Sequence, residues 1–240
     1  MIMSRKNKAD AGFYPTLVTV IIIFLACIMM LVVLQPGLPI EPDINIRMAY
    51  MRDHRNIWLF SWLLWMASAL GLLLFCFYLL PFLPKSGITY YSLAIITIGI
   101  VPDITAEFIY AVILPWIATN TVVANGITLQ ISTEHFRTLE YLAVLLTGGF
   151  GNGAYNAGGL MLNILGFRNQ LLPRWLLWLG IPSWLLGLAL SISTIINEPF
   201  LMRFFTAASM ALSLIWMFLI AMIIFRRPQK YLWQEEGATR

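Results

Sequence analysis

Apolar residues run along the chain in six long stretches, separated by shorter and more polar segments. Each stretch is long enough to cross a hydrocarbon core of about 30 Å, which takes roughly 20 helical residues. None shows the alternation of a single strand, and a helix satisfies its own backbone hydrogen bonds in lipid. The stretches cover residues 14–34, 57–80, 90–116, 139–165, 175–196 and 204–225. The pattern predicts an all-α fold, a single transmembrane domain over residues 1–240 formed by a bundle of six transmembrane helices.

The Lys and Arg residues predict the orientation of these helices, because cytoplasmic loops carry an excess of them. With the N-terminus inside, ten basic residues fall on the cytoplasmic side and five on the other. The inner ones are Arg5, Lys6, Lys8, Lys85, Arg168, Arg174, Arg226, Arg227, Lys230 and Arg240, and the outer ones are Arg47, Arg52, Arg55, Arg137 and Arg203. We therefore expect both termini to be cytoplasmic, with the cluster at 226–230 anchoring the last helix.

Two outer connections, 35–56 and 117–138, are longer than a turn. The first contains three prolines followed by Asp43, a residue type that caps helices. We expect a helix from Ile44 to Asn56 that runs on into the second span. The second connection is too polar to span and is expected to lie against the membrane or to dip into the bundle.

Composition supports the membrane assignment and narrows the function. Hydrophobic residues make up 60% of the chain and charged residues 11%, whereas soluble domains carry roughly 25% charged residues. The net charge of +4 does not indicate nucleic-acid binding, because the basic residues flank apolar stretches and form no single stripe. We expect the lipid bilayer as the partner, in a prokaryotic plasma (inner) membrane or an internal photosynthetic membrane. A membrane-protein partner or a second copy of the chain is a further expectation.

Cysteine and histidine are too scarce for the common metal and haem sites. Cys27 and Cys76 both lie in apolar stretches, without the spacing of a disulfide framework or a zinc site. His54 and His135 are the only two histidines, too few for the multi-histidine clusters of di-iron desaturases or b-type cytochromes. We expect no cofactor and no metal.

Tryptophans gather at the expected ends of the helices, where indole rings favour the membrane interface. They are Trp58, Trp62, Trp65, Trp116, Trp175 and Trp178. We interpret them as an interfacial belt; the alternative is a cage around a pigment or ligand.

Two carboxylates, Asp103 and Glu107, lie in the middle of the third stretch. A charged group at the centre of a membrane costs roughly 2.5–3.5 kcal/mol on an insertion scale, so a partner or a function is expected to keep each of them there. Four residues apart on a helix, they share one face. Pro102, directly before them, removes a backbone hydrogen bond and frees a carbonyl. Together these groups predict a proton relay or a cation site; the alternative is a polar clasp that holds neighbouring helices in register.

The fourth stretch offers a smooth and polar face to a neighbour. Gly149, Gly153 and Ala157 recur every four residues, as do Asn152 and Asn156, and small residues let helices approach closely. We expect this face to pack on the carboxylate face of the third stretch. The two asparagines would then donate hydrogen bonds to Asp103 and Glu107, with Tyr110 and Tyr155 as further partners.

Glu134, His135, Arg137 and Glu140 cluster before the fourth stretch. A metal site is one interpretation, but we favour the first turn of a helix capped by Ser132 or Thr133, with acidic residues at its positive end. Arg203 is expected at the interface, or reaching inward to a carboxylate.

The string 172–180, Leu-Pro-Arg-Trp-Leu-Leu-Trp-Leu-Gly, follows the Asn- and Gly-rich fourth stretch and precedes a final helix that contains Trp216. It resembles a bacterial family of multi-pass membrane proteins of unknown function, in which a Pro-Arg-Trp-Leu signature opens the penultimate helix. That family has an acidic helix at mid-chain, which Asp103 and Glu107 match. The resemblance implies the topology and transfers no catalytic residue.

These observations predict a small integral membrane protein that binds a small ligand, or moves a proton or cation, through Asp103 and Glu107. A structural or assembly subunit of a larger membrane complex is the alternative. A lipid-modifying enzyme comes third, because the sequence shows no nucleophile with an adjacent base, no metal set and no phosphate-binding motif. An enzyme is therefore not the favoured interpretation.

Overall fold

The computed structural model describes residues 5–121, 126–169 and 173–225. These residues are 92% helical and contain no strand, so the predicted all-α fold is confirmed. The basic cluster at 226–230, expected to anchor the last helix, lies outside the described residues.

Five continuous helical rods within the described ranges are long and apolar enough to cross a membrane. The first joins α1 (Arg5–Met29), η1 (Met30–Leu34) and η2 (Gln35–Gly37), the second α3 (Arg55–Leu79) and η3 (Leu80–Phe82), and the third α4 (Gly87–Phe108), η4 (Ile109–Ile113) and α5 (Leu114–Thr121). The fourth is α8 (Arg174–Ile195), and the fifth joins α9 (Pro199–Ile220) and η6 (Ala221–Phe225). The chain is therefore compatible with a multi-pass membrane protein.

A further rod joins α6 (Ile127–Val144), η5 (Leu145–Gly151) and α7 (Asn152–Asn169). Its glycines and asparagines lower its mean hydropathy, so it is not among the five most apolar rods. The segment 117–138 was expected to be a connection between two helices, and this prediction is wrong. Most of the segment is helical, because α5 continues to Thr121 and α6 begins at Ile127. Hydropathy marks the part of a helix suited to lipid, whereas backbone hydrogen bonds extend a helix beyond that part.

The helix α2 (Ile44–Asp53) begins where the sequence predicts. The Asp43 side chain caps it by accepting a hydrogen bond of 2.8 Å from the backbone N–H of Asn45. We expected α2 to continue into α3 without a break, and this prediction is wrong. The helical backbone is interrupted at His54, which has φ −114° and ψ 25°. A separate α2 can therefore turn and pack against α5.

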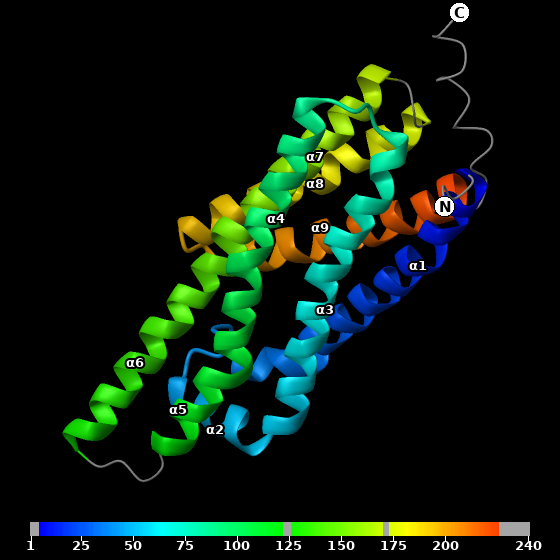
Figure 1. Cartoon of the computed structure of the whole chain (residues 1–240). Coiled ribbons are helices and arrows are strands. Elements are labelled where there is room, and N and C mark those ends of the chain that lie inside the picture. The colour runs from blue at the N-terminus through cyan, green and yellow to red at the C-terminus, as the bar shows by residue number, and fades with distance from the viewer. Residues whose placement is uncertain (1–4, 122–125, 170–172, 226–240) are drawn as a thin grey trace, which may run out of the picture.

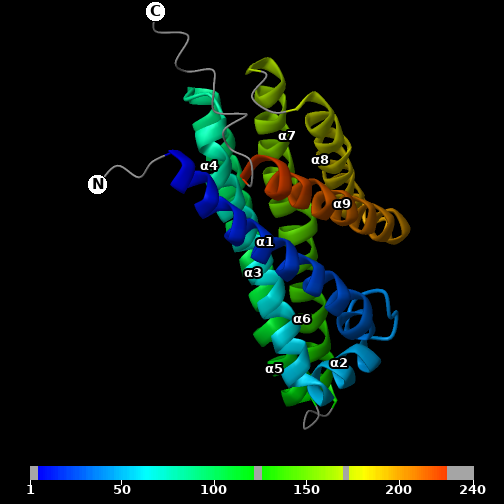
Figure 2. The same ribbon diagram turned by 90° about the vertical axis from the view of Figure 1, so that its right-hand side faces the viewer.

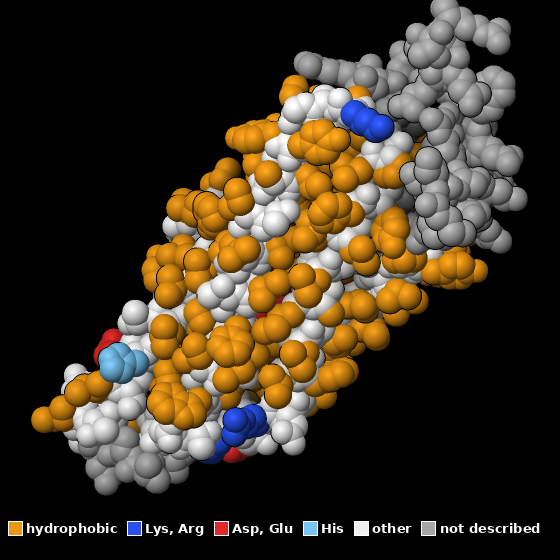
Figure 3. Space-filling view, viewed as in Figure 1, with side chains coloured by type: hydrophobic (Ala, Val, Ile, Leu, Met, Phe, Trp, Pro, Cys, Tyr) orange, Lys and Arg blue, Asp and Glu red, His pale blue; other side chains and the backbone are white. Residues whose placement is uncertain are grey.

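The helices form one elongated bundle. In Figures 1 and 2, α4 runs beside α7, α8 lies between α7 and α9, and α1 lies along α3. The side chains that pack between them form two apolar clusters, one around Phe75, Trp184 and Trp216 and the other around Trp58, Trp62 and Tyr110. On the face shown in Figure 3, hydrophobic side chains cover the middle and basic side chains lie toward the ends, as expected for a surface in lipid.

The prediction of an interfacial belt is wrong for three of the six tryptophans. Trp116, Trp175 and Trp178 are exposed, but Trp58, Trp62 and Trp65 are buried. The latter three are spaced by four and three residues, which places them on one face of α3, and that face points into the bundle. There the ring of Trp62 stacks on Tyr110 at 4.6 Å between centroids.

Candidate functional site

Asp103 faces the interior of the bundle, with 6% of its surface exposed. Two glycines place it there, because they allow the backbones of α4 and η5 to touch. A Cβ added at Gly99 would lie 2.7 Å from the carbonyl oxygen of Gly151. The expected packing of the fourth stretch on the carboxylate face is therefore confirmed, although Gly151 makes this contact and Gly149 and Gly153 instead face α8.

The hydroxyl of Thr147, in η5, donates a hydrogen bond to Oδ1 of Asp103. Among the described residues, this is the one hydrogen bond that the Asp103 carboxylate receives. Sequence reasoning missed Thr147, although it lies one helical turn before Gly151 on the face that meets α4. The turn of η5 is π-helical, a geometry that often occurs at functional sites.

Asn152 and Asn156 do not donate to the carboxylates, so that expectation is wrong. Nδ2 of Asn152 donates to the carbonyl of Gly187 at 2.6 Å and to Oγ of Ser191 at 2.8 Å, both in α8. Nδ2 of Asn156 donates to the backbone and side-chain oxygens of Asn152, at 2.7 and 2.8 Å. Both side chains lie on the α8 side of α7; the hydrogen bonds of Asn152 fix α7 against α8, and those of Asn156 hold the Asn152 side chain.

Glu107 lies one turn after Asp103 and is 2% exposed. Its Oε2 has no hydrogen-bond partner within the described part of the chain. The two carboxyl groups are close enough to interact electrostatically. A low-dielectric interior makes an unpaired charge costly, so this pair requires a proton or a cation.

The two tyrosines lie in different surroundings. Tyr155 is close enough to interact electrostatically with both Asp103 and Glu107. Tyr110 packs in the aromatic cluster, where its backbone carbonyl accepts a hydrogen bond of 2.6 Å from the indole of Trp58. The structure therefore brings Tyr155 to the carboxylates and places Tyr110 against Trp58 and Trp62.

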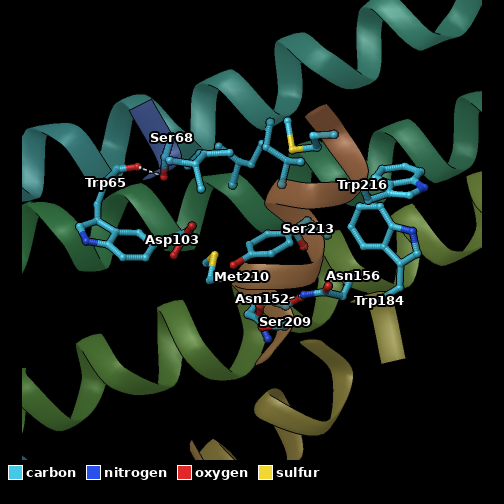
Figure 4. A pocket seen from close by; sticks show the side chains of 16 residues that line it. Trp65, Ser68, Asp103, Asn152, Asn156, Trp184, Ser209, Met210, Ser213 and Trp216 are labelled. Carbon is cyan, nitrogen blue, oxygen red and sulfur yellow. Dashed lines mark hydrogen bonds between the residues drawn. The ribbon is translucent and has the colours of Figure 1, made fainter. Parts of the chain in front are cut away.

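A cavity of about 70 Å³ lies next to Asp103, where several helices converge. It is shown in Figure 4, and residues of α1, α3, α4, α7, α8 and α9 line it. Its polar lining consists of Ser68, Asp103, Asn152, Tyr155, Asn156, Ser209 and Ser213, and its aromatic lining includes Trp65, Trp184 and Trp216. One water molecule needs roughly 10–15 Å³, so the cavity has room for several waters or for a small ligand. Four of the six predicted site residues line it; Glu107 and Tyr110 do not.

A buried ion pair joins Arg47 of α2 to Glu140 of α6, and sequence reasoning missed it. Nε and Nη2 of Arg47 donate to the two carboxylate oxygens of Glu140 at 3.1 and 2.7 Å. Nη1 of Arg47 donates to the backbone carbonyl of Glu41 at 2.5 Å. Because the partners are 93 residues apart, no local pattern indicates the pair.

The expected first helical turn around Glu134 is wrong, because α6 begins at Ile127 after Gly126. Glu134 instead forms an exposed ion pair with Arg137, at 2.9 Å. Arg203 is exposed and donates to the carbonyl of Pro199 at 3.3 Å, and it reaches no carboxylate of the described residues.

Within the described ranges, no group of three or more His, Cys, Asp and Glu side chains is arranged to hold a metal ion.

The string 172–180 begins outside the described residues. Its described part includes the start of α8 at Arg174, as predicted. No family model, curated protein or solved structure matches this chain.

Proposed function

We propose that the chain crosses the membrane six times, with both termini in the cytoplasm, and that the rod from α6 to α7 is the sixth span. This rod packs between two strongly apolar helices, α4 and α8. The N-terminal end of α1 and the last turn of η6 lie at the same end of the bundle in Figure 1, and the two elements are in contact. An even number of crossings fits that arrangement, and five crossings do not. The excess of basic residues on this side favours the cytoplasm of a prokaryotic cell or the corresponding side of an internal photosynthetic membrane.

We further propose that the protein binds a proton or a small cationic ligand at Asp103 and Glu107 and moves it within the membrane. The observation that carries this proposal is the position of the Asp103 carboxylate, which lines a cavity and has Thr147 as its one described hydrogen-bond donor. Intramembrane carboxylates in such positions mark ion and proton pathways. A polar clasp would join Asp103 to several donors from neighbouring helices, whereas here Asn152 donates to α8 and Asn156 donates to Asn152.

The Asp103→Asn variant tests this function. Asparagine keeps the shape of the side chain and removes its charge and its proton-carrying capacity. In liposomes containing the purified protein, we expect a pH- or cation-dependent flux to fall by about tenfold or more, since a charged hydrogen bond contributes roughly 1.5–3 kcal/mol. The flux is measured with an entrapped pH indicator or an ion-selective electrode.

Glu134→Gln is the matched control, because Glu134 is an exposed carboxylate outside the cavity. It should leave the flux unchanged. If Asp103→Asn folds and keeps the full flux, the proposal is wrong. If this variant instead fails to accumulate in the membrane, the result favours the clasp, and co-purification in mild detergent then tests whether the chain is an assembly subunit.

A further inference from the structure

The walls of the cavity differ from those of an inorganic cation site. Ca²⁺ takes six to eight oxygen ligands, and Mg²⁺ demands six in an octahedron. Hydrogen bonds within and between the helices already set the positions of the three serine hydroxyls: Ser68 donates to Trp65, Ser209 donates to Thr206, and Ser213 bonds to Ser183. The carboxylate of Asp103 is the one acidic group that lines the cavity. A divalent metal ion would therefore find a single carboxylate there to balance its charge.

The aromatic walls instead fit an organic cation. In Figure 4 the ring of Trp65 lies beside the Asp103 carboxylate, while Trp184 and Trp216 stand together at the other end of the cavity. The last two rings are packed edge to face, at 5.3 Å between centroids and 80° between planes. A hydrogen bond of 2.9 Å from Nε1 of Trp216 to the carbonyl of Leu176 fixes one of them. Aromatic rings attract cations over their faces, and cages of such rings recognise alkylammonium groups.

The size of the cavity limits the ligand. An apolar cavity of about 150 Å³ holds benzene, and this cavity has about 70 Å³. It accommodates a cation of only a few non-hydrogen atoms. Methylammonium and dimethylammonium have this size, and their N–H groups suit the Asp103 carboxylate while their methyl groups suit the indoles.

We infer that the cavity binds a small alkylammonium ion, with its nitrogen at Asp103 and its methyl groups toward Trp184 and Trp216. This inference rests on the proposed function, because it names the cation that Asp103 holds. Trp65, beside the carboxylate, contributes an aromatic wall at the charged end.

The test compares cations on the full-length protein in lipid nanodiscs by isothermal titration calorimetry. Methylammonium and dimethylammonium chloride are the probes, and sodium and potassium chloride at equal ionic strength are the comparison. We expect the alkylammonium ions to bind more tightly. Asp103→Asn should weaken their binding by about ten- to hundredfold, and Trp65→Leu by about threefold or more. Trp178→Leu, which removes an exposed indole that does not line the cavity, should change nothing.

The outcomes separate this inference from the function on which it rests. If sodium or potassium binds as tightly as the alkylammonium ions, the inference is overturned while Asp103 remains a cation site. If no cation binds but the Asp103-dependent proton flux persists, the inference is also overturned and the function stands. If neither binding nor flux depends on Asp103, both are overturned. The comparison of cations needs only the unmodified protein, so poor folding of a variant does not obscure it.

Discussion

Replacing Arg47 with leucine is expected to lower the free energy of unfolding by about 3–5 kcal/mol, because it leaves the Glu140 carboxylate buried without its partner. The Arg47 and Glu140 side chains are only 7% and 5% exposed, and their contact is bidentate. The backbone carbonyl of Glu41 also loses its donor. Unfolding is followed by far-ultraviolet circular dichroism during titration of mixed micelles with sodium dodecyl sulfate.

Two further variants isolate the cause of this loss. Arg137→Leu breaks an ion pair whose side chains are more than half exposed, so it should cost less than about 1 kcal/mol. The double variant Arg47→Met/Glu140→Leu removes both charges and should recover most of the stability, because apolar replacements of a whole buried pair are often neutral. A double variant as unstable as Arg47→Leu would show that the loss comes from packing and not from the unpaired charge.

Replacing Gly99 with leucine is expected to cost about 3 kcal/mol, at the upper end of the usual range for overpacking. A Cβ there would meet the Gly151 carbonyl at 2.7 Å and the Cβ of Ala154 at 2.9 Å. These atoms belong to the backbone or lie next to it, so the helices themselves must separate. Separation should also remove the hydrogen bond from Thr147 to Asp103.

Gly87→Leu is the matched control in the same helix. Gly87 is exposed at the start of α4, and no atom lies within 4 Å of a Cβ added there. It should be neutral or slightly stabilising, because glycine is a poor helix former. Equal losses at positions 99 and 87, measured by the same titration, would contradict the close approach of α4 and η5.

Hydropathy predicts the helices of this protein well and their ends less well. The burial of Asp103 and Glu107 also follows from the sequence, since two acidic groups on an apolar helix cannot face lipid cheaply. The segment 117–138 looked like a loop because it is polar, yet polar residues do not end a helix that keeps its backbone bonds. A better signal within this segment is Gly126, which has a φ of 55° directly before α6 begins.

The donor to Asp103 depends on packing over a long range. Thr147, Asn152 and Asn156 all lie on one rod, and the contact of Gly99 with Gly151 decides which of them meets α4. The π-helical turn of η5 takes more residues per turn than an α-helix, so α-helical spacing misplaces the residues that follow it. Gly151, Ala154 and Gly158 meet α4, so the face that carries the asparagines meets α8.

Water and cations are expected to reach the cavity beside Asp103. Ser209 lines this cavity and is 6% exposed, whereas Ser193 in α8 is 2% exposed and does not line it. With Cys27 and Cys76 replaced by serine and alanine, each position is changed to cysteine in turn. The rate of modification is then measured with two small haloalkyl reagents of the same size, the cation 2-bromoethylammonium and the neutral 2-bromoethanol.

We predict that Ser209→Cys reacts faster than Ser193→Cys. We also predict that Asp103→Asn slows the cationic reagent at position 209 without slowing the neutral one. Equal rates at the two positions, or a rate for the cationic reagent that does not depend on Asp103, would contradict the account.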